Sequence, residues 1–183
     1  MTTSAESGAA IDRGVDLLRR LALARPALLA EFEASLPDYF RAGTPDPLQP
    51  DEVLSSARRH LEWFLFERWS PSLGDLAVEG LMGTFEEQAD EDVLELQEAF
   101  LASMAGIFEV REIAARSMQL RDLGSLQDVV VLEEGAAGFE VGDLVVGRLF
   151  PLGEGTHHVS RAAGVFRDEE LRGAWAFDDA AGT

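Results

Sequence analysis

The three histidines are the residues whose possible chemistry is easiest to name, because imidazole binds zinc or iron and transfers protons near neutral pH. His157 and His158 are adjacent, and His60 lies far from them in the chain. In a strand, neighbouring side chains point to opposite faces, so only one of the pair could join His60 and a carboxylate around a metal ion. No recognised ligand spacing links the three residues. We therefore favour the other interpretation, a polar strand edge and an unrelated helical histidine.

Two aspartates and two arginines in the second half of the chain could also be functional. Asp122 and Asp143 each follow a short step typical of a turn, where an aspartate usually accepts hydrogen bonds from its own backbone. We favour this turn role over general acid–base catalysis. Arg121 and Arg148 lie in predicted strands of an acidic protein, so we expect them to pair with carboxylates, and anion binding is the alternative.

Several kinds of chemistry are excluded by composition. The chain has no cysteine, which rules out disulfides, thiolate nucleophiles and cysteine-based zinc sites. It also has no lysine and no asparagine, which indicates a GC-rich genome and removes Schiff-base chemistry. The segment Gly135-Ala-Ala-Gly138 lacks the spacing of a phosphate-binding loop, and no Gly-x-Ser-x-Gly motif occurs. We therefore predict no catalytic residue and no cofactor.

The net charge of −19 is concentrated in one stretch of the chain. Residues 84–105 carry seven acidic side chains and no basic one: Glu86, Glu87, Asp90, Glu91, Asp92, Glu95 and Glu98. Such a surface repels phosphate, so direct nucleic-acid binding is not expected. The run also lacks the pattern of a calcium-binding loop. It could be a solvated helix face or the docking surface for a basic protein partner.

The first half of the chain shows helical periodicity. We predict helices over residues 11–23, 26–40 with a kink or an end at Pro37, and 51–69. Thr84 and Glu87 have the spacing of a capping box. This spacing predicts that a long amphipathic helix begins at Thr84, continues to about residue 104 and carries the acidic run.

After Gly106 the apolar residues alternate with a period of two, which is typical of strands. The expected strands are 107–113, 117–120, 128–132, 144–150 and 156–160, with an extension of the last to residue 166 as the alternative. The predicted fold class is α+β: an N-terminal helical bundle followed by a small antiparallel five-stranded β-barrel, SH3-like or OB-like. The predicted divisions are a disordered tail (1–10), a helical region (11–105), the barrel (106–166), and a C-terminal short helix with an acidic tail (167–183).

Four segments resemble the conserved region of bacterial proteins that often carry a SEC-C zinc motif. They are Glu62-Trp-Phe-Leu-Phe-Glu67, Ile107-Phe-Glu-Val110, Leu120-Arg-Asp-Leu123 and the strand from Val141 to Pro151. The resemblance covers about residues 55–166 and implies the same order of helices and strands. The SEC-C motif itself requires cysteine, so it is absent from this chain. The family has no established enzymatic activity, and the resemblance therefore implies a fold but no reaction.

These observations favour a non-catalytic adaptor that binds a basic protein partner. Its contact surface would be the acidic run or an exposed strand edge of the barrel. The chain has no membrane-spanning stretch and no signal-peptide pattern, so we expect a cytoplasmic protein. One alternative is a metal-dependent enzyme that uses His60, His157 or His158 with carboxylates. A second is an acidic mimic of nucleic acid.

Overall fold

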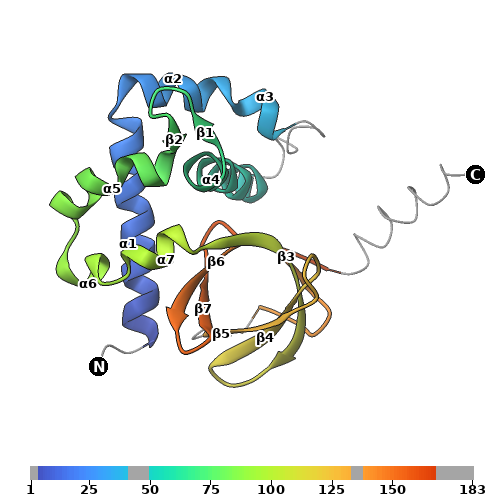
Figure 1. Cartoon of the computed structure of the whole chain (residues 1–183). Helices are drawn as coiled ribbons and strands as arrows, with labels where there is room; N and C mark the ends of the chain where they lie inside the picture. Colours follow the sequence, from blue (N-terminus) through green and yellow to red (C-terminus); the bar gives the residue numbers. More distant parts are fainter. Residues whose placement is uncertain (1–3, 41–49, 133–137, 168–183) are drawn as a thin grey trace, which may run out of the picture. The chain divides into compact units, whose positions relative to one another are not determined.

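The computed structural model describes residues 4–40, 50–132 and 138–167, and the chain divides into two compact units, Met1–Ser103 and Met104–Thr183. Helices make up most of the first unit, and a closed β-barrel makes up the second (Figure 1). The fold class is therefore α+β, as predicted. The division lies just before residue 106, where the barrel was expected to begin. The predicted C-terminal helix and acidic tail lie outside the described residues from 168 onward.

The helical unit contains seven helices and one small hairpin among its described residues. The helices are α1 (Ser4–Leu23), α2 (Pro26–Ala34), α3 (Leu36–Tyr39), α4 (Pro50–Phe66), α5 (Ala77–Gln88), α6 (Glu91–Leu94) and α7 (Gln97–Leu101). The hairpin pairs β1 (Trp69–Ser70) with β2 (Asp75–Leu76). Proline occupies the first turn of α2 and of α3, where its missing N–H costs no helical hydrogen bond. The expected break near Pro37 falls at Ser35.

The predicted disordered tail is largely helical, because α1 already begins at Ser4. The stretch that follows is rich in alanine, the strongest helix former, and Ala10 and Ile11 are buried. Helix α1 packs against α5 and α6, and such tertiary packing stabilises a helix. The predicted helix began at Ile11, because the small residues before it show no hydrophobic periodicity.

The acidic run does not form the single helix that was predicted. Thr84 lies inside α5, so it caps nothing, and its hydroxyl instead accepts a hydrogen bond from Arg25 Nη2 at 3.0 Å. The chain leaves the helix after Gln88 and continues as the short helices α6 and α7. Like charges four residues apart, such as Glu87 with Glu91, repel one another along a continuous helix. A break at this point relieves that repulsion.

The barrel consists of five strands in a closed ring, with a sixth short strand attached. The strands are β3 (Met104–Ile113), β4 (Ser117–Asp122), β5 (Asp128–Leu132), β6 (Leu144–Gly153), β7 (Thr156–Val159) and β8 (Gly164–Phe166). The order around the ring is β3-β4-β5-β7-β6, and β3 pairs with β6 to close it. The described core of the barrel comprises Phe108, Val110, Met118, Leu120, Val131, Val145, Leu149 and Val159.

The prediction that the barrel is antiparallel is wrong for one pair of strands. β5 and β7 are parallel, with Val130 opposite Thr156 and Val131 opposite His157. Every other neighbouring pair is antiparallel. Direction must alternate between antiparallel neighbours, and five strands in a closed ring cannot alternate throughout. Closure of an odd number of strands therefore requires at least one parallel pair, and the barrel is mixed.

The β4–β5 turn holds Leu126 in a conformation that leucine rarely adopts. Its φ is +61°, and the side chain is 70% exposed, so no buried contact compensates for the backbone strain. Asparagine tolerates this left-handed region better than leucine. We expect Leu126→Asn to raise the free energy of unfolding by roughly 0.5–1 kcal/mol in urea denaturation. Leu123→Asn makes the same chemical change in the same turn at a residue without positive φ. Equal effects at the two positions would contradict the role of strain.

Candidate functional site

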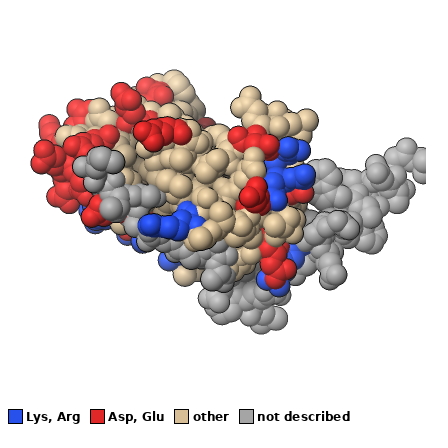
Figure 2. Space-filling view, turned by 90° about the horizontal axis from the view of Figure 1, so that it is seen from below, with Lys and Arg blue, Asp and Glu red and all other residues tan. Residues whose placement is uncertain are grey.

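The seven acidic residues of the run lie along the end of α5, through α6 and into α7. Each of them is exposed to solvent. We call this set the acidic surface: Glu86, Glu87, Asp90, Glu91, Asp92, Glu95 and Glu98. Figure 2 shows acidic side chains gathered at the left of the molecule, the side on which Figure 1 places α6. The broken helix thus still presents these carboxylates as one region.

Little of this charge is neutralised inside the protein. Among the described residues, one ion pair reaches the acidic surface, and it joins Arg13 of α1 to Asp92. Both side chains of that pair are about half exposed, so it is screened by water and contributes little to stability. The other six carboxylates have no ion pair with a described residue. These carboxylates therefore create a negative electrostatic potential at the surface of the protein.

The acidic surface contains a hollow of about 410 Å³, lined by Glu86, Glu91, Leu94, Glu95 and Gln97. Three carboxylates and one apolar side chain therefore line the same open depression. The Oε1 atom of Gln97 is buried and has no hydrogen-bond partner among the described residues. A buried acceptor without a donor is costly unless a ligand or water supplies one. The hollow therefore has the acceptors and the apolar wall that suit a lysine or arginine side chain.

Two residues of this hollow, Leu94 and Gln97, were not predicted to belong to a site. Both lie in the stretch that was expected to be one regular helix, whose acidic and apolar faces would point in opposite directions. The break after Gln88 reorients the following segments and brings an apolar residue beside the carboxylates. The spacing of like charges is a signal in the sequence that could have indicated this break.

His60 belongs to the interior of the helical unit. Its ring stacks on Phe32 with 4.5 Å between centroids, and its Nε2 lies 2.8 Å from the hydroxyl of Ser35. That hydroxyl donates to the carbonyl oxygen of Phe32 at 2.7 Å, so the His60 Nε2–H is the donor to Ser35. Burial lowers the pKa of His60, and the nearby positive charge of Arg68 lowers it further. The geometry is that of a neutral histidine within an aromatic core.

His157 and His158 lie next to each other in β7 of the barrel unit, opposite Pro151 and Phe150 of β6. The Nδ1 atom of His157 is buried and has no hydrogen-bond partner among the described residues. Within residues 4–40, 50–132 and 138–167, no three histidine, aspartate or glutamate side chains are grouped as metal ligands. His60, by contrast, lies in the other unit. The described residues therefore offer no metal centre built from the three histidines.

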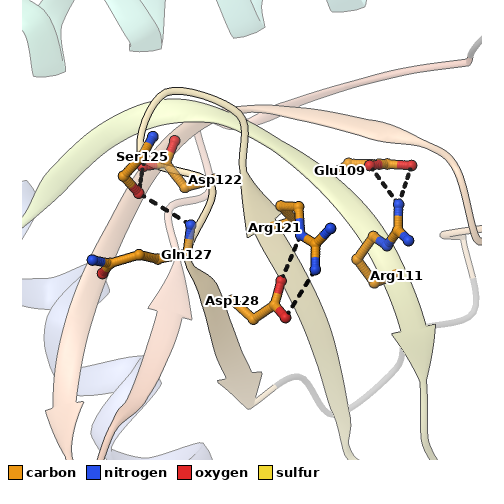
Figure 3. A network of polar contacts seen from close by, with 7 residues as sticks. All are labelled: Glu109, Arg111, Arg121, Asp122, Ser125, Gln127 and Asp128. Carbon is orange, nitrogen blue, oxygen red and sulfur yellow. Dashed lines mark hydrogen bonds and ion pairs between the residues drawn. The ribbon is translucent and has the colours of Figure 1, made fainter.

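The aspartates of the barrel make the turn contacts that were predicted. Asp122 accepts a hydrogen bond from the backbone N–H of Gly124 at 3.0 Å. It also accepts one from the hydroxyl of Ser125 at 2.6 Å, which Figure 3 shows. The Ser125 hydroxyl and the Gly124 N–H lower the pKa of Asp122, because they stabilise its charged form. Asp143 accepts from the backbone of Glu140 at 2.8 Å. Both side chains thus hold the ends of strands in place.

Arg121 forms the carboxylate pair that was expected of it. Its Nε and Nη2 atoms donate to the two carboxylate oxygens of Asp128 at 2.8 and 3.1 Å, directly across β4 and β5 (Figure 3). These hydrogen bonds lower the pKa of Asp128. Both partners are more than a third exposed, so the pair supports strand register more than stability. Arg148, in contrast, is buried within β6.

Comparison with known proteins adds no relative: no family model, no curated protein and no solved structure matches this chain. The resemblance to the SEC-C-associated proteins therefore stays a prediction. In the part of the chain that the structure describes, none of the helices combines the length and the apolar character needed to cross a membrane.

Proposed function

We propose that this protein is a non-catalytic, cytoplasmic adaptor that binds a basic protein partner through its acidic surface. The observation that carries the proposal is the hollow between Glu86, Glu91 and Glu95, with the buried unpaired acceptor of Gln97 beside it. A protruding lysine or arginine would place its charge among the carboxylates and its aliphatic stem against Leu94.

The electrostatics of the unit support the same proposal. Six carboxylates without an ion pair create a negative potential that speeds the approach of a basic surface. An interaction of this kind weakens as salt rises, because exposed charges are screened over about 10 Å at 0.1 M salt. A partner held through the acidic surface should therefore dissociate at high salt.

The two alternative functions make different demands on the molecule. A metal-dependent enzyme would need His60, His157 or His158 to gather carboxylates around an ion, and His60 already donates to Ser35 in the core. An acidic mimic of nucleic acid would use the same acidic surface, but it would compete with DNA or RNA for its partner. Whether DNA or RNA competes with this protein for a captured partner should therefore also be measured.

A charge-neutral variant with a matched control tests the proposal. The test variant is Glu86→Gln, Glu91→Gln and Glu95→Gln, and the control is Glu33→Gln, Glu79→Gln and Glu112→Gln, all exposed residues outside the hollow. Both variants keep side-chain size and have the same net charge. Each is used to capture proteins from a lysate of the source cells, and the dissociation constant of the captured protein is then measured.

We expect the test variant to weaken binding at least about tenfold, or about 1.4 kcal/mol, relative to the control. The wild-type complex should weaken on raising the salt from about 0.05 to 0.5 M. Equal binding by the two variants would show that only the total charge matters. Binding that is insensitive to salt would contradict the proposal altogether.

A further inference from the structure

A second hollow in the helical unit is lined mainly by aromatic and charged side chains. It has a volume of about 630 Å³, and its lining residues are Asp38, Tyr39, Trp63, Glu67, Arg68 and Trp69. That volume falls in the range of about 300–1,000 Å³ that is usual for small-molecule sites. None of these residues belongs to the acidic surface, so the hollow is a separate feature. Its residues come from α3, from the end of α4, from β1 and from the two residues that join α4 to β1, and these elements lie in the upper part of Figure 1.

The aromatic walls are held in place by the core behind them. The ring centroids of Tyr39 and Trp63 are 5.6 Å apart, and Trp63 stacks on His60 with 6.1 Å between centroids. The third ring, Trp69, is 59% exposed, although burial of that ring would be favourable. Two indoles and a phenol thus form a surface with partly uncovered faces, which attract cations through their negative quadrupole.

The hairpin that carries Trp69 is anchored to α2. Ser70, the next residue, donates its hydroxyl to Glu31 Oε2 at 2.7 Å, and the backbone N–H of Ser72 donates to Glu31 Oε1 at 2.9 Å. Burial opposes ionisation of Glu31, but these hydrogen bonds and the charge of Arg68 hold its pKa below the ordinary value. Glu31 is therefore charged near neutral pH. These contacts hold the hairpin backbone beside Trp69 against α2.

The charge of the lining favours a cation. Asp38 and Glu67 contribute −2 and Arg68 contributes +1, so the lining has a net charge of −1. Arg68 Nη2 is 4.0 Å from Asp38 Oδ2, which is too long for a hydrogen bond. The hollow also lies at the C-terminal end of α4, where the helix dipole is negative. The net charge of the lining and the dipole at the end of α4 are therefore both negative.

Arg68 adds a requirement for a hydrogen-bond acceptor. Its Nη1 atom is buried and has no hydrogen-bond partner among the described residues, and its guanidinium carbon lies 6.0 Å from the centroid of the Phe64 ring. Because Nη1 itself is covered, a ligand oxygen would meet the rest of the Arg68 guanidinium, whose side chain is 22% exposed. A suitable ligand therefore carries a positive group for the aromatic rings and an oxygen for Arg68.

We propose that this hollow binds a weakly hydrated organic cation that also carries an oxygen acceptor, with its charge against Tyr39, Trp63 and Trp69 and its oxygen at Arg68. Quaternary ammonium and guanidinium groups share this chemistry, because both lose little hydration when they stack on an aromatic ring. The source is either a small choline-like molecule or an arginine side chain of a peptide. This site goes beyond the proposed adaptor function and uses none of the acidic surface.

Choline and a neutral molecule of the same shape provide a direct test. The probes are choline, 3,3-dimethylbutan-1-ol, in which carbon replaces the charged nitrogen, and Nα-acetylarginine amide. Binding is followed by the indole N–H signals of Trp63 and Trp69 in two-dimensional NMR, with Trp175→Phe removing the signal of the third tryptophan. We expect choline or the arginine amide to shift both signals saturably and to bind about tenfold more tightly than the neutral alcohol. The tighter of the two cations identifies the source.

A variant of the exposed ring separates this site from general attraction to an acidic protein. Trp69→Ala should weaken binding of the preferred cation by about fivefold, followed by the Trp63 signal alone. Leu101→Ala removes an apolar side chain of similar exposure, at 49%, and should leave binding unchanged. The proposal is overturned if neither cation shifts the two indole signals, if the neutral alcohol binds equally well, or if the two alanine variants behave alike.

Discussion

Replacing Gly14 by alanine is expected to lower the free energy of unfolding by about 2–3 kcal/mol, whereas Gly83→Ala should raise it by about 1 kcal/mol. Both glycines lie inside helices, Gly14 in α1 and Gly83 in α5. Alanine is the better helix former by about 1 kcal/mol at either position. The opposite signs therefore depend on what the new methyl group contacts.

At Gly14 the added Cβ would lie 2.1 Å from Cζ of Phe100 and 2.9 Å from both Cε atoms of the same ring. Phe100 is buried, and its ring packs edge-on against Phe85 with 5.4 Å between centroids. The ring cannot retreat without disturbing a second buried ring, so overpacking exceeds the gain in helix propensity. At Gly83 no atom lies within 4 Å of the new Cβ, so the substitution there has only the favourable effect of the higher helix propensity of alanine.

Denaturation in urea measures both variants, since the linear extrapolation gives the change in unfolding free energy directly. The double variant Gly14→Ala with Phe100→Leu tests the mechanism. If the clash with the ring is the cause, the smaller side chain should remove at least about 1 kcal/mol of the cost of alanine at Gly14. A cost that is unchanged by Phe100→Leu would show that the destabilisation comes from elsewhere in α1.

The strands could be predicted because each side chain in a barrel faces either the core or the solvent. Phe108 and Val110 in β3, and Met118 and Leu120 in β4, alternate with less buried residues at the expected period of two. Strand order and direction depend on which segments close the ring, and a local pattern does not contain that information. The parallel pairing of β5 with β7 is one such long-range consequence.

The candidate sites were harder to predict from the sequence than the strands, because they depend on the residues at which the helices end. The acidic residues themselves were identified correctly as an exposed group. Their hollow, however, exists only because the chain breaks after Gln88 and places Leu94 and Gln97 beside them. The aromatic hollow brings Asp38 and Trp69 together from distant parts of the chain. From the sequence alone, Trp63 on a flanking face of its helix favours packing between helices over a ligand cage.

His60→Ala should be the most destabilising change at a polar residue of the helical core, with an expected loss of about 3 kcal/mol. The imidazole stacks on Phe32 at 4.5 Å and packs near Tyr39 and Trp63 at 5.0 and 6.1 Å, so its removal leaves a cavity among aromatic rings. Ser35, which is fully buried, would also lose the donor at 2.8 Å. His60→Phe keeps the stacked ring and should cost only about 1 kcal/mol, the value of one hydrogen bond.

The pH dependence of stability distinguishes this neutral histidine from an ordinary exposed one. The pKa of an unfolded histidine is about 6.5, and burial and Arg68 hold the folded pKa of His60 below that value. Between the two values the unfolded chain binds more protons, so the free energy of unfolding falls as the pH decreases. The stabilisation is therefore complete above about pH 6.5 and is lost as the pH falls through the folded pKa.

The variant His60→Phe should lack this part of the pH dependence, because phenylalanine does not titrate. Urea denaturation at several values between about pH 7.5 and pH 5 would then show the wild-type protein losing stability more steeply than the variant. His157 and His158 are present in both proteins, so the difference between the two curves belongs to His60 alone. Parallel curves would mean that His60 is as easily protonated in the fold as in the unfolded chain. The ring would then have access to water, contrary to its packing among Phe32, Tyr39 and Trp63.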